Sequence, residues 1–203
     1  MKIVSFYTEK TPYEKVANEL LIPSVKKWEL DSDIQGVPDR GSWANNTAIK
    51  SEYIRDMLLK YKEPVIFLDC DATIEQYPEL FNHIPKETDL AYLLFNWYGH
   101  WRGQWENRSK MELLSGTMYF GYNEKVLKLV DNWIIKVKEN ISVLEQKILE
   151  GLVNENKDLT LYYLPYEYCC VLMQDYSIPK YITEPVIVHT QASRKYRNFK
   201  RNQ

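Results

Sequence analysis

The chain contains an apolar run that leads directly into two aspartates, Pro64-Val65-Ile66-Phe67-Leu68-Asp69-Cys70-Asp71. A short run of β-branched and large apolar residues between polar flanks is typical of a strand buried on both faces. Because charges are rarely left inside such a strand, we expect Asp69 and Asp71 to lie where it leaves its sheet. Ligands of open α/β sheets bind beyond the carboxyl ends of strands, and carboxylates there suit Mg²⁺ or Mn²⁺. The stretch therefore predicts a divalent-metal site at the end of a buried strand.

Strand and helix patterns alternate around this stretch. Strands are predicted at residues 2–8, 64–68, 89–95, 113–122, 159–164 and 185–188, and helices from residue 12 and over 43–61, 126–137 and 141–153. Residues 31–42 have the composition of a loop, and residues 96–112 form an irregular aromatic segment. The alternation predicts one α/β domain over residues 1–203, with a mixed, mostly parallel central sheet flanked by helices.

Composition and cysteine usage indicate a globular protein with reduced thiols. With 203 residues, 45% hydrophobic and 27% charged, the chain is typical of a globular domain, and its net charge of −2 gives no general attraction to nucleic acid. The three cysteines, Cys70, Cys169 and Cys170, are a poor disulfide framework, so we expect reduced thiols. Because we find neither a secretory signal nor an apolar run near the roughly 20 residues of a membrane span, we expect a cytoplasmic protein.

The context Val65-Ile66-Phe67-Leu68-Asp69-Cys70-Asp71-Ala72 resembles the metal-binding motif of GT-A glycosyltransferases. In that family the carboxylates that follow this strand bind a divalent ion, and the ion holds the diphosphate of the donor. The resemblance implies a GT-A (Rossmann-like) domain and a Mn²⁺ or Mg²⁺ ion held by Asp69 and Asp71. It also implies transfer of a sugar from a nucleotide-diphosphate donor, above all a UDP-sugar, to an acceptor hydroxyl.

A histidine at the end of a later strand extends the resemblance. The pattern His189-x-x-Ala192-x-x-Lys195 resembles the His-x-x-Gly-x-x-Lys element of glycogenin-like family 8 enzymes. In those enzymes the histidine completes the metal site and the lysine meets the phosphates, which implies these roles for His189 and Lys195 and favours a retaining reaction. Ala192 replaces the family's glycine, which leaves the path of the loop open. The alternative for His189 is an ordinary core or surface histidine.

The resemblance also implies residues that face the donor. Three residues end the first strand, where the family holds the base and ribose: Phe6, Tyr7 and Thr8. Lys50 belongs to the helix before the metal strand, where similar enzymes carry a basic or polar residue facing the donor. The alternatives are a core aromatic for Tyr7 and a plain exposed helix lysine for Lys50.

Two further segments occur in the same sequence order as the corresponding elements of the GT-A family. Gly116 lies in a strand that resembles the one bordering the donor sugar, where a glycine allows close approach of the ligand; its alternative is a β-bulge. Glu145 and Gln146 stand where such enzymes place an acidic pair or an Asp-Gln facing the sugar. A carboxylate there can act as a base in an inverting reaction or stabilise positive charge in a retaining one. The alternative is a capping box, Ser142-x-x-Glu145, that only begins a helix.

The acceptor and two rival functions stay open at this stage. The aromatic segment from Trp97 to Arg108 is predicted to be a lid over the sugar or acceptor, or a flap that packs on the core. The basic tail, residues 194–203, is compatible with an acceptor in modified DNA, as in some bacteriophage enzymes, beside a glycan or small molecule. It is also compatible with a non-catalytic nucleic-acid-binding module. A nucleotidyltransferase is disfavoured because no glycine follows the first strand between residues 7 and 12.

Overall fold

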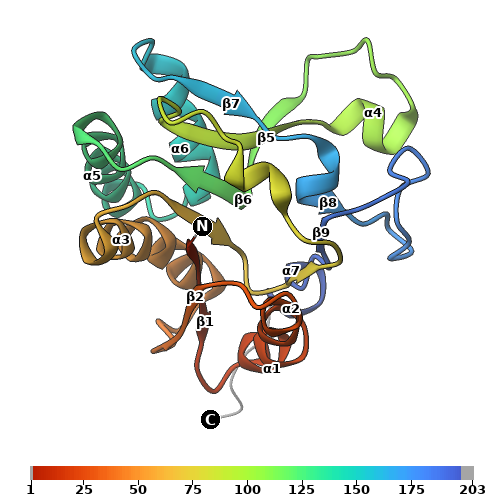
Figure 1. Ribbon diagram of the computed structural model, residues 1–203, viewed down its shortest axis with the longest axis horizontal. Coiled ribbons are helices and arrows are strands. Elements are labelled where there is room, and N and C mark those ends of the chain that lie inside the picture. Colours follow the sequence, from red (N-terminus) through yellow and green to blue (C-terminus); the bar gives the residue numbers. More distant parts are fainter. Residues whose placement is uncertain (1, 198–203) are drawn as a thin grey trace.

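A computed structural model of the protein describes residues 2–197. Its larger sheet has six strands in the order β2 (Ser32–Val37), β1 (Lys2–Thr8), β3 (Val65–Leu68), β6 (Met111–Phe120), β5 (Leu90–Asn96) and β7 (Leu161–Tyr163) (Figure 1). Strand β1 runs parallel to β2 and β3, and β5 runs parallel to β7. Strand β6 is antiparallel to both of its neighbours. This arrangement confirms the predicted mixed, mostly parallel α/β sheet.

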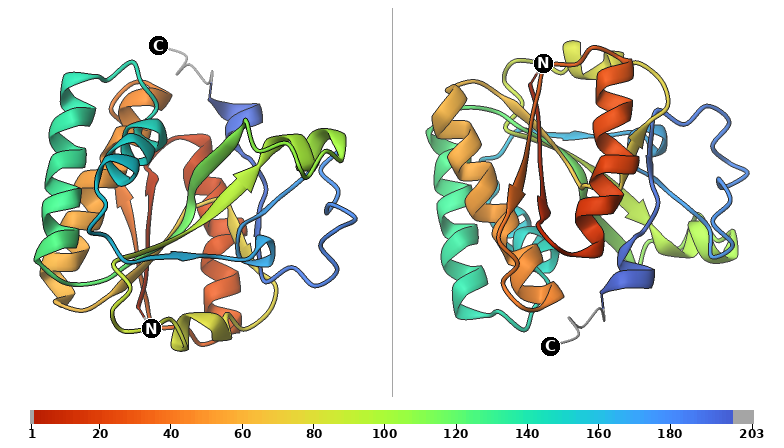
Figure 2. Two further views of the ribbon diagram at one scale, coloured as in Figure 1. Left: turned by 90° about the horizontal axis from the view of Figure 1, so that it is seen from above. Right: turned by 90° about the horizontal axis from the view of Figure 1, so that it is seen from below.

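Helices cover the two faces of this sheet (Figure 2). One face packs against α3 (Trp43–Tyr61), α5 (Glu124–Glu139) and α6 (Glu145–Glu155), and the other packs against α1 (Pro12–Glu19) and α2 (Leu21–Lys27). All four residues of β3 are buried, and they alternate between the two cores, with Phe67 in the first and Ile66 in the second. The prediction of a strand buried on both faces is therefore confirmed, which places the end of β3 firmly relative to the helices.

A second, three-stranded sheet positions the end of the chain beside β3. It consists of β4 (Ala72–Ile74), β9 (Ile187–His189) and β8 (Cys170–Val171), in that order. Strand β4 begins directly after Asp71 and pairs antiparallel with β9, so that Ala72 lies opposite His189. The remaining short elements are η1 (Glu79–Asn82), α4 (Trp97–Arg102), η2 (Tyr166–Cys169) and α7 (Ser193–Tyr196). The pairing of β4 with β9 brings two parts of the chain together that lie far apart in sequence.

The structure corrects three of the predicted elements. The predicted loop at 31–42 contains β2, an edge strand whose partly exposed side chains leave no clear apolar pattern and which is held by its parallel pairing with β1. The segment predicted to be irregular, 96–112, begins with α4, whose first turn is capped by the Asn96 side chain. The helix predicted from residue 141 begins at Glu145.

Other expectations meet the structure only in part. The three cysteines are free thiols, as expected, with Cys169 and Cys170 buried. In the part of the chain that is described, no helix has the length and apolar character needed to cross a bilayer. The predicted basic tail begins with Arg194 and Lys195 in α7, while residues 198–203, which include Lys200 and Arg201, lie outside the described residues.

Candidate active site

A cavity of about 430 Å³ opens at the carboxyl end of β3. Its walls come from β1, α1, α3, β6, α6 and the segment after β9, which are far apart in the sequence. The cavity is lined by all the site residues expected from the sequence except one: Phe6, Tyr7, Thr8, Lys50, Asp69, Asp71, Gly116, Glu145, Gln146 and His189. The end of the buried strand is therefore the place where the expected residues converge.

Three potential metal ligands lie together in this cavity. One ligand atom from each of Asp69, Asp71 and His189 lies within 4.8 Å of the others. Two carboxylates and one imidazole form a donor set that suits a divalent ion such as Mn²⁺. The donor chemistry and the spacing both fit a divalent ion.

Asp71 also organises the loop that follows β9. Its Oδ2 accepts a hydrogen bond from the backbone N–H of Ala192 at 2.8 Å, and its Oδ1 lies 3.3 Å from His189 Nδ1. Burial raises the pKa of Asp71. The hydrogen bond and charge of His189, together with the Ala192 N–H, lower this pKa by more than burial raises it, so the net shift is downward. Ala192 has φ −52°, which any residue adopts, and the left-handed residue of this loop is Gln191, with φ 57°. The loop therefore accepts alanine where the family pattern has glycine.

His189 is held between two residues of β6. The side chain is buried, and its Nε2 lies 2.8 Å from the hydroxyl of Thr117. A Cβ atom at Gly116 would lie only 3.0 Å from His189 Cε1, so the glycine gives the ring room. The pairing of β5 with β6 also shifts register across residues 115–117, so the β-bulge considered for Gly116 is present as well. Burial lowers the pKa of His189, but Cys169 and Asp71 raise it more, and the net shift is upward.

Lys50 is buried at the centre of an ionic cluster, so the alternative of a plain exposed lysine is wrong. Its Nζ lies 2.9 Å from Asp69 Oδ1 and 3.2 Å from Glu145 Oε1, and it donates to Ser115 Oγ at 2.9 Å. Burial lowers the pKa of Lys50, but the two carboxylates raise it more, so the ammonium form is maintained. Burial also raises the pKa of Asp69, against the opposing effect of Lys50. Lys50 thereby links the end of β3 to α6.

Glu145 points to Lys50 rather than closing its helix. It is the first residue of α6, Leu144 stands at the N-cap without a side-chain cap, and the capping box from Ser142 is therefore wrong. Glu145 is 4% exposed, and its Oε2 has no hydrogen-bond partner among the described residues. A buried, lone carboxylate oxygen in a cavity wall is an unusual feature that a ligand can satisfy.

Gln146 is fixed by hydrogen bonds at both ends of its amide. Its Oε1 accepts from the Ser115 N–H at 2.9 Å, and its Nε2 donates to Glu112 Oε1 at 2.6 Å. Gln146 thus lies in the cavity wall directly beside Glu145, against the same bulge of β6.

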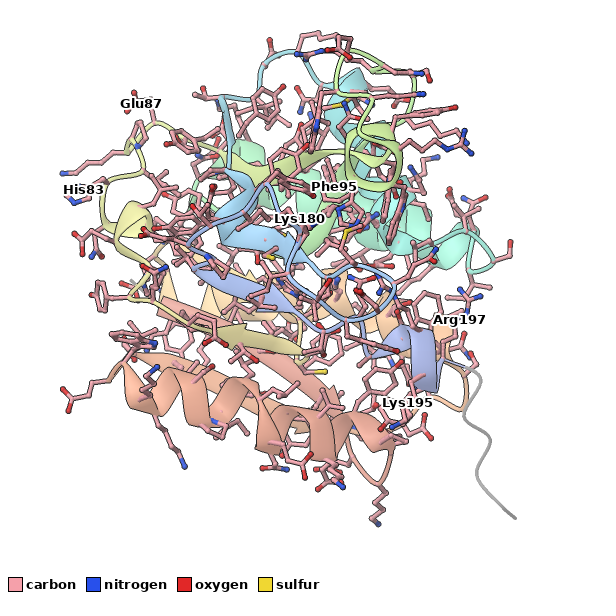
Figure 3. The ribbon with its side chains drawn as sticks, turned by 90° about the vertical axis from the view of Figure 1, so that its right-hand side faces the viewer. His83, Glu87, Phe95, Lys180, Lys195 and Arg197 are labelled. Atoms are coloured by element: carbon pink, nitrogen blue, oxygen red, sulfur yellow. The ribbon has the colours of Figure 1, made fainter. Side chains whose placement is uncertain are left out.

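Lys195 is the expected site residue that the structure does not bring into the cavity lining. It lies on α7 with its ammonium 5.1 Å from the ring centre of Tyr196. Arg197, just after α7, does line the cavity, and Figure 3 shows both basic side chains at this end of the described chain. Three other residues at the site were not expected from the sequence: Tyr13 and Trp43, which line the cavity, and Thr117, which contacts His189. An aromatic in a helix and a threonine in a strand are both ordinary, so neither gives a signal in the sequence.

The mixed sheet, the carboxylates that end its buried strand and the histidine that faces them match the arrangement expected of a GT-A fold. The chain belongs to the nucleotide-diphospho-sugar transferase family, whose model matches residues 27–203. Membership of this family makes the protein an enzyme rather than a non-catalytic nucleic-acid-binding module.

Solved structures with the same fold are distant in sequence. A glycosyltransferase involved in glycosylation of the major capsid of PBCV-1 is 14% identical, with a TM-score of 0.67 over 93% of this chain and 91% of that one. The galactosyltransferase LgtC, in complex with donor and acceptor sugar analogues, is 12% identical, with a TM-score of 0.56 over 93% and 86%. Mouse xyloside xylosyltransferase 1 is 10% identical, with a TM-score of 0.53 over 93% and 97%. No curated protein matches the sequence significantly. At these identities the structures establish the fold.

Proposed function

We propose that this enzyme is a divalent-metal-dependent, retaining glycosyltransferase that uses a nucleoside-diphosphate sugar, with a UDP-sugar as the first donor to test. The observation that carries the proposal is the clustering of Asp69, Asp71 and His189 within 4.8 Å in a cavity large enough for a ligand. An ion bound by these residues would neutralise the charge that develops on the leaving diphosphate. Mn²⁺ and Mg²⁺ both suit this ligand set.

Other residues of the cavity are proposed to bind the phosphates, the base and the ribose of the donor. Lys50 holds Asp69 and Glu145 in place, and its charge adds to the positive potential at the phosphates. Arg197 lines the cavity and is a second candidate for the phosphates, beside Lys195. Phe6 packs on Tyr53 and Phe67 and supports the wall, which leaves Tyr7 and Thr8 to face the base and ribose.

Glu145 and Gln146 are proposed to face the sugar. In a retaining reaction the lone Glu145 oxygen would stabilise positive charge on the sugar ring, whereas in an inverting reaction it would accept the acceptor's proton. A further structure with the same fold is an active-site mutant of LgtC in which glutamine is replaced by glutamate. By analogy, we propose an active-site role for Gln146, a glutamine of the cavity lining. The anomeric configuration of the product distinguishes the retaining from the inverting mechanism.

Donor hydrolysis tests the proposed function directly. The purified protein is incubated with a panel of nucleotide sugars, with Mn²⁺ or with EDTA, and the released nucleoside diphosphate is measured. We expect slow release from one donor with Mn²⁺ and at least about a tenfold loss with EDTA, because the leaving group then lacks its counter-ion. Equal release in EDTA would contradict the metal-dependent mechanism, and no release from any donor would contradict the choice of donor class.

Thr117 is expected to set the affinity of the metal site. Its hydroxyl is hydrogen-bonded to Nε2 of His189. The other ring nitrogen, Nδ1, faces Asp71 and is therefore the one that would bind the ion. Thr117→Val should therefore weaken Mn²⁺ binding about tenfold, measured by calorimetry on the donor-free protein. Thr73→Val, at a strand threonine outside the cavity lining, is the matched control. Unchanged Mn²⁺ affinity in Thr117→Val would show that the hydroxyl does not orient the histidine.

A further inference from the structure

The cavity has two chemically different ends on either side of β3. Residues from β1, α1 and α3, among them Tyr7, Tyr13 and Trp43, form one end, which the proposed function assigns to the nucleotide. The opposite end is formed by Trp97, which follows β5, together with Glu112 and Gln146. In the sheet, β1 lies on one side of β3, while β6 and β5 lie on the other. An acceptor that meets the donor sugar therefore has the Trp97 end available to it.

Trp97 belongs to both the cavity and the surface beyond it. Its indole N–H donates to Glu112 Oε2 at 2.7 Å, and Glu112 in turn accepts from Gln146. One helical turn later, Trp101 stacks on Trp97 with ring centres 6.0 Å apart and planes inclined by 15°. Trp97 is partly buried and Trp101 is 36% exposed, so the stacked pair leads from the cavity wall to solvent.

The surrounding residues hold this pair in place. Trp105 folds back against Gly99, where any side chain would collide with its ring, and its carbonyl accepts from the Asn96 amide at 2.9 Å. Phe95, labelled in Figure 3, packs edge-on against Trp97 at 4.6 Å at the end of β5. These contacts hold Trp97 and Trp101 in place without a ligand, which lowers the entropic cost of ligand binding.

A guanidinium anchored by backbone carbonyls lies over the partly exposed Trp101 ring. The Arg194 guanidinium lies 5.7 Å from the centre of the Trp101 ring and donates to the carbonyls of Leu172 and Met173 at 2.8 and 2.7 Å. Guanidinium carries five N–H donors, so further donors stay available to a ligand. The part of Trp101 that stays exposed (36%), together with an anchored hydrogen-bond donor, matches a pyranose, which has an apolar C–H face and a rim of hydroxyls.

We propose that Trp97, Trp101 and Arg194 form an acceptor subsite for a carbohydrate, with the sugar ring packed on Trp101 and its hydroxyls bound by Arg194. This inference rests on the proposed function, because it assigns the acceptor of that same transfer. It places the acceptor glycan at the end of the cavity opposite the nucleotide, so that its hydroxyl approaches the donor sugar beside Gln146.

The test uses an array of immobilised oligosaccharides and hydroxyl-bearing peptides. Wild-type protein is applied with Mn²⁺ and the donor that it hydrolyses, and incorporation of labelled sugar is read at each position. We expect incorporation on glycans, about a tenfold loss of acceptor kcat/KM in Trp101→Ala and partial recovery in Trp101→Phe. Tyr163→Ala, which removes an even more exposed aromatic (56% against 36%) from β7, is the control and should leave acceptor kcat/KM unchanged.

The possible outcomes separate this inference from the proposed function. Incorporation only on peptides, or wild-type acceptor kinetics in Trp101→Ala, would overturn the carbohydrate subsite while the donor reaction stands. If no donor is hydrolysed, the proposed function fails, and direct glycan binding on the same array then tests the subsite alone. Glycan binding that is lost in Trp101→Ala supports it, and absence of binding by the wild type overturns it.

Discussion

Asp71→Asn is expected to lower the transfer rate by about a thousandfold while the chain stays folded. The variant removes one ligand charge, and metal stabilisation of a leaving group contributes several kcal/mol, at 1.36 kcal/mol for each factor of ten. The amide keeps the size of the carboxylate, and its oxygen can still accept from the Ala192 N–H, so the loop after β9 is retained. Donor hydrolysis measures the rate, calorimetry the Mn²⁺ affinity, and circular dichroism the fold.

The control for this variant is Asp131→Asn, which removes a carboxylate that pairs with Arg55 between α3 and α5, away from the cavity lining. It should leave both the rate and the Mn²⁺ affinity unchanged. A folded Asp71→Asn protein with the wild-type rate would show that Asp71 organises the loop without binding the ion.

Lys50→Met is expected to lower the free energy of unfolding by about 3 kcal/mol. Methionine fills the space of the lysine stem but leaves Glu145, 4% exposed, and Asp69 without their counter-charge in the cavity wall. Breaking a buried pair on one side is costly because the remaining charge stays desolvated. Urea unfolding at neutral pH measures the change.

Two further variants identify the cause of that loss. Lys147→Met removes a lysine that also contacts two carboxylates, Glu112 and Glu150, but is 45% exposed, so it should cost less than about 1 kcal/mol. Adding Glu145→Gln to Lys50→Met should restore part of the stability, because the unpaired charge is then gone. If the double variant is no more stable than Lys50→Met, the loss comes from packing rather than from charge.

The features that were predictable from sequence are those in which local pattern and burial agree. The apolar run before Asp69 between polar flanks indicates a buried strand, so its burial on both faces and the exit of both aspartates at its end followed from the residues alone. His189 could be predicted as a site residue only from the family resemblance. It lies 118 residues after Asp71 in the sequence, and the pairing of β4 with β9 that brings the two together is not encoded in any local pattern.

The features that were missed depend on tertiary contacts. Strand β2 exists because β1 offers it a parallel edge, and its own residues, Ser32-Asp33-Ile34-Gln35-Gly36-Val37, carry weak strand propensity. The burial of Lys50 could not be predicted, since a lysine in a helix is usually solvated and only the carboxylates of two other elements make its burial tolerable.

The pairing of β9 with β4 has a consequence for the order in which activity arises. The larger sheet has all its strands once Tyr163 is in place, yet β9 and the loop beyond it are still missing. A chain folded to that stage would have the strand that carries Asp69 and Asp71 but not the histidine that faces them. Long-range closures of this kind are slow steps in folding. With the metal site proposed above, we expect a chain folded only as far as β7 to lack one of the three ligands and to hydrolyse no donor.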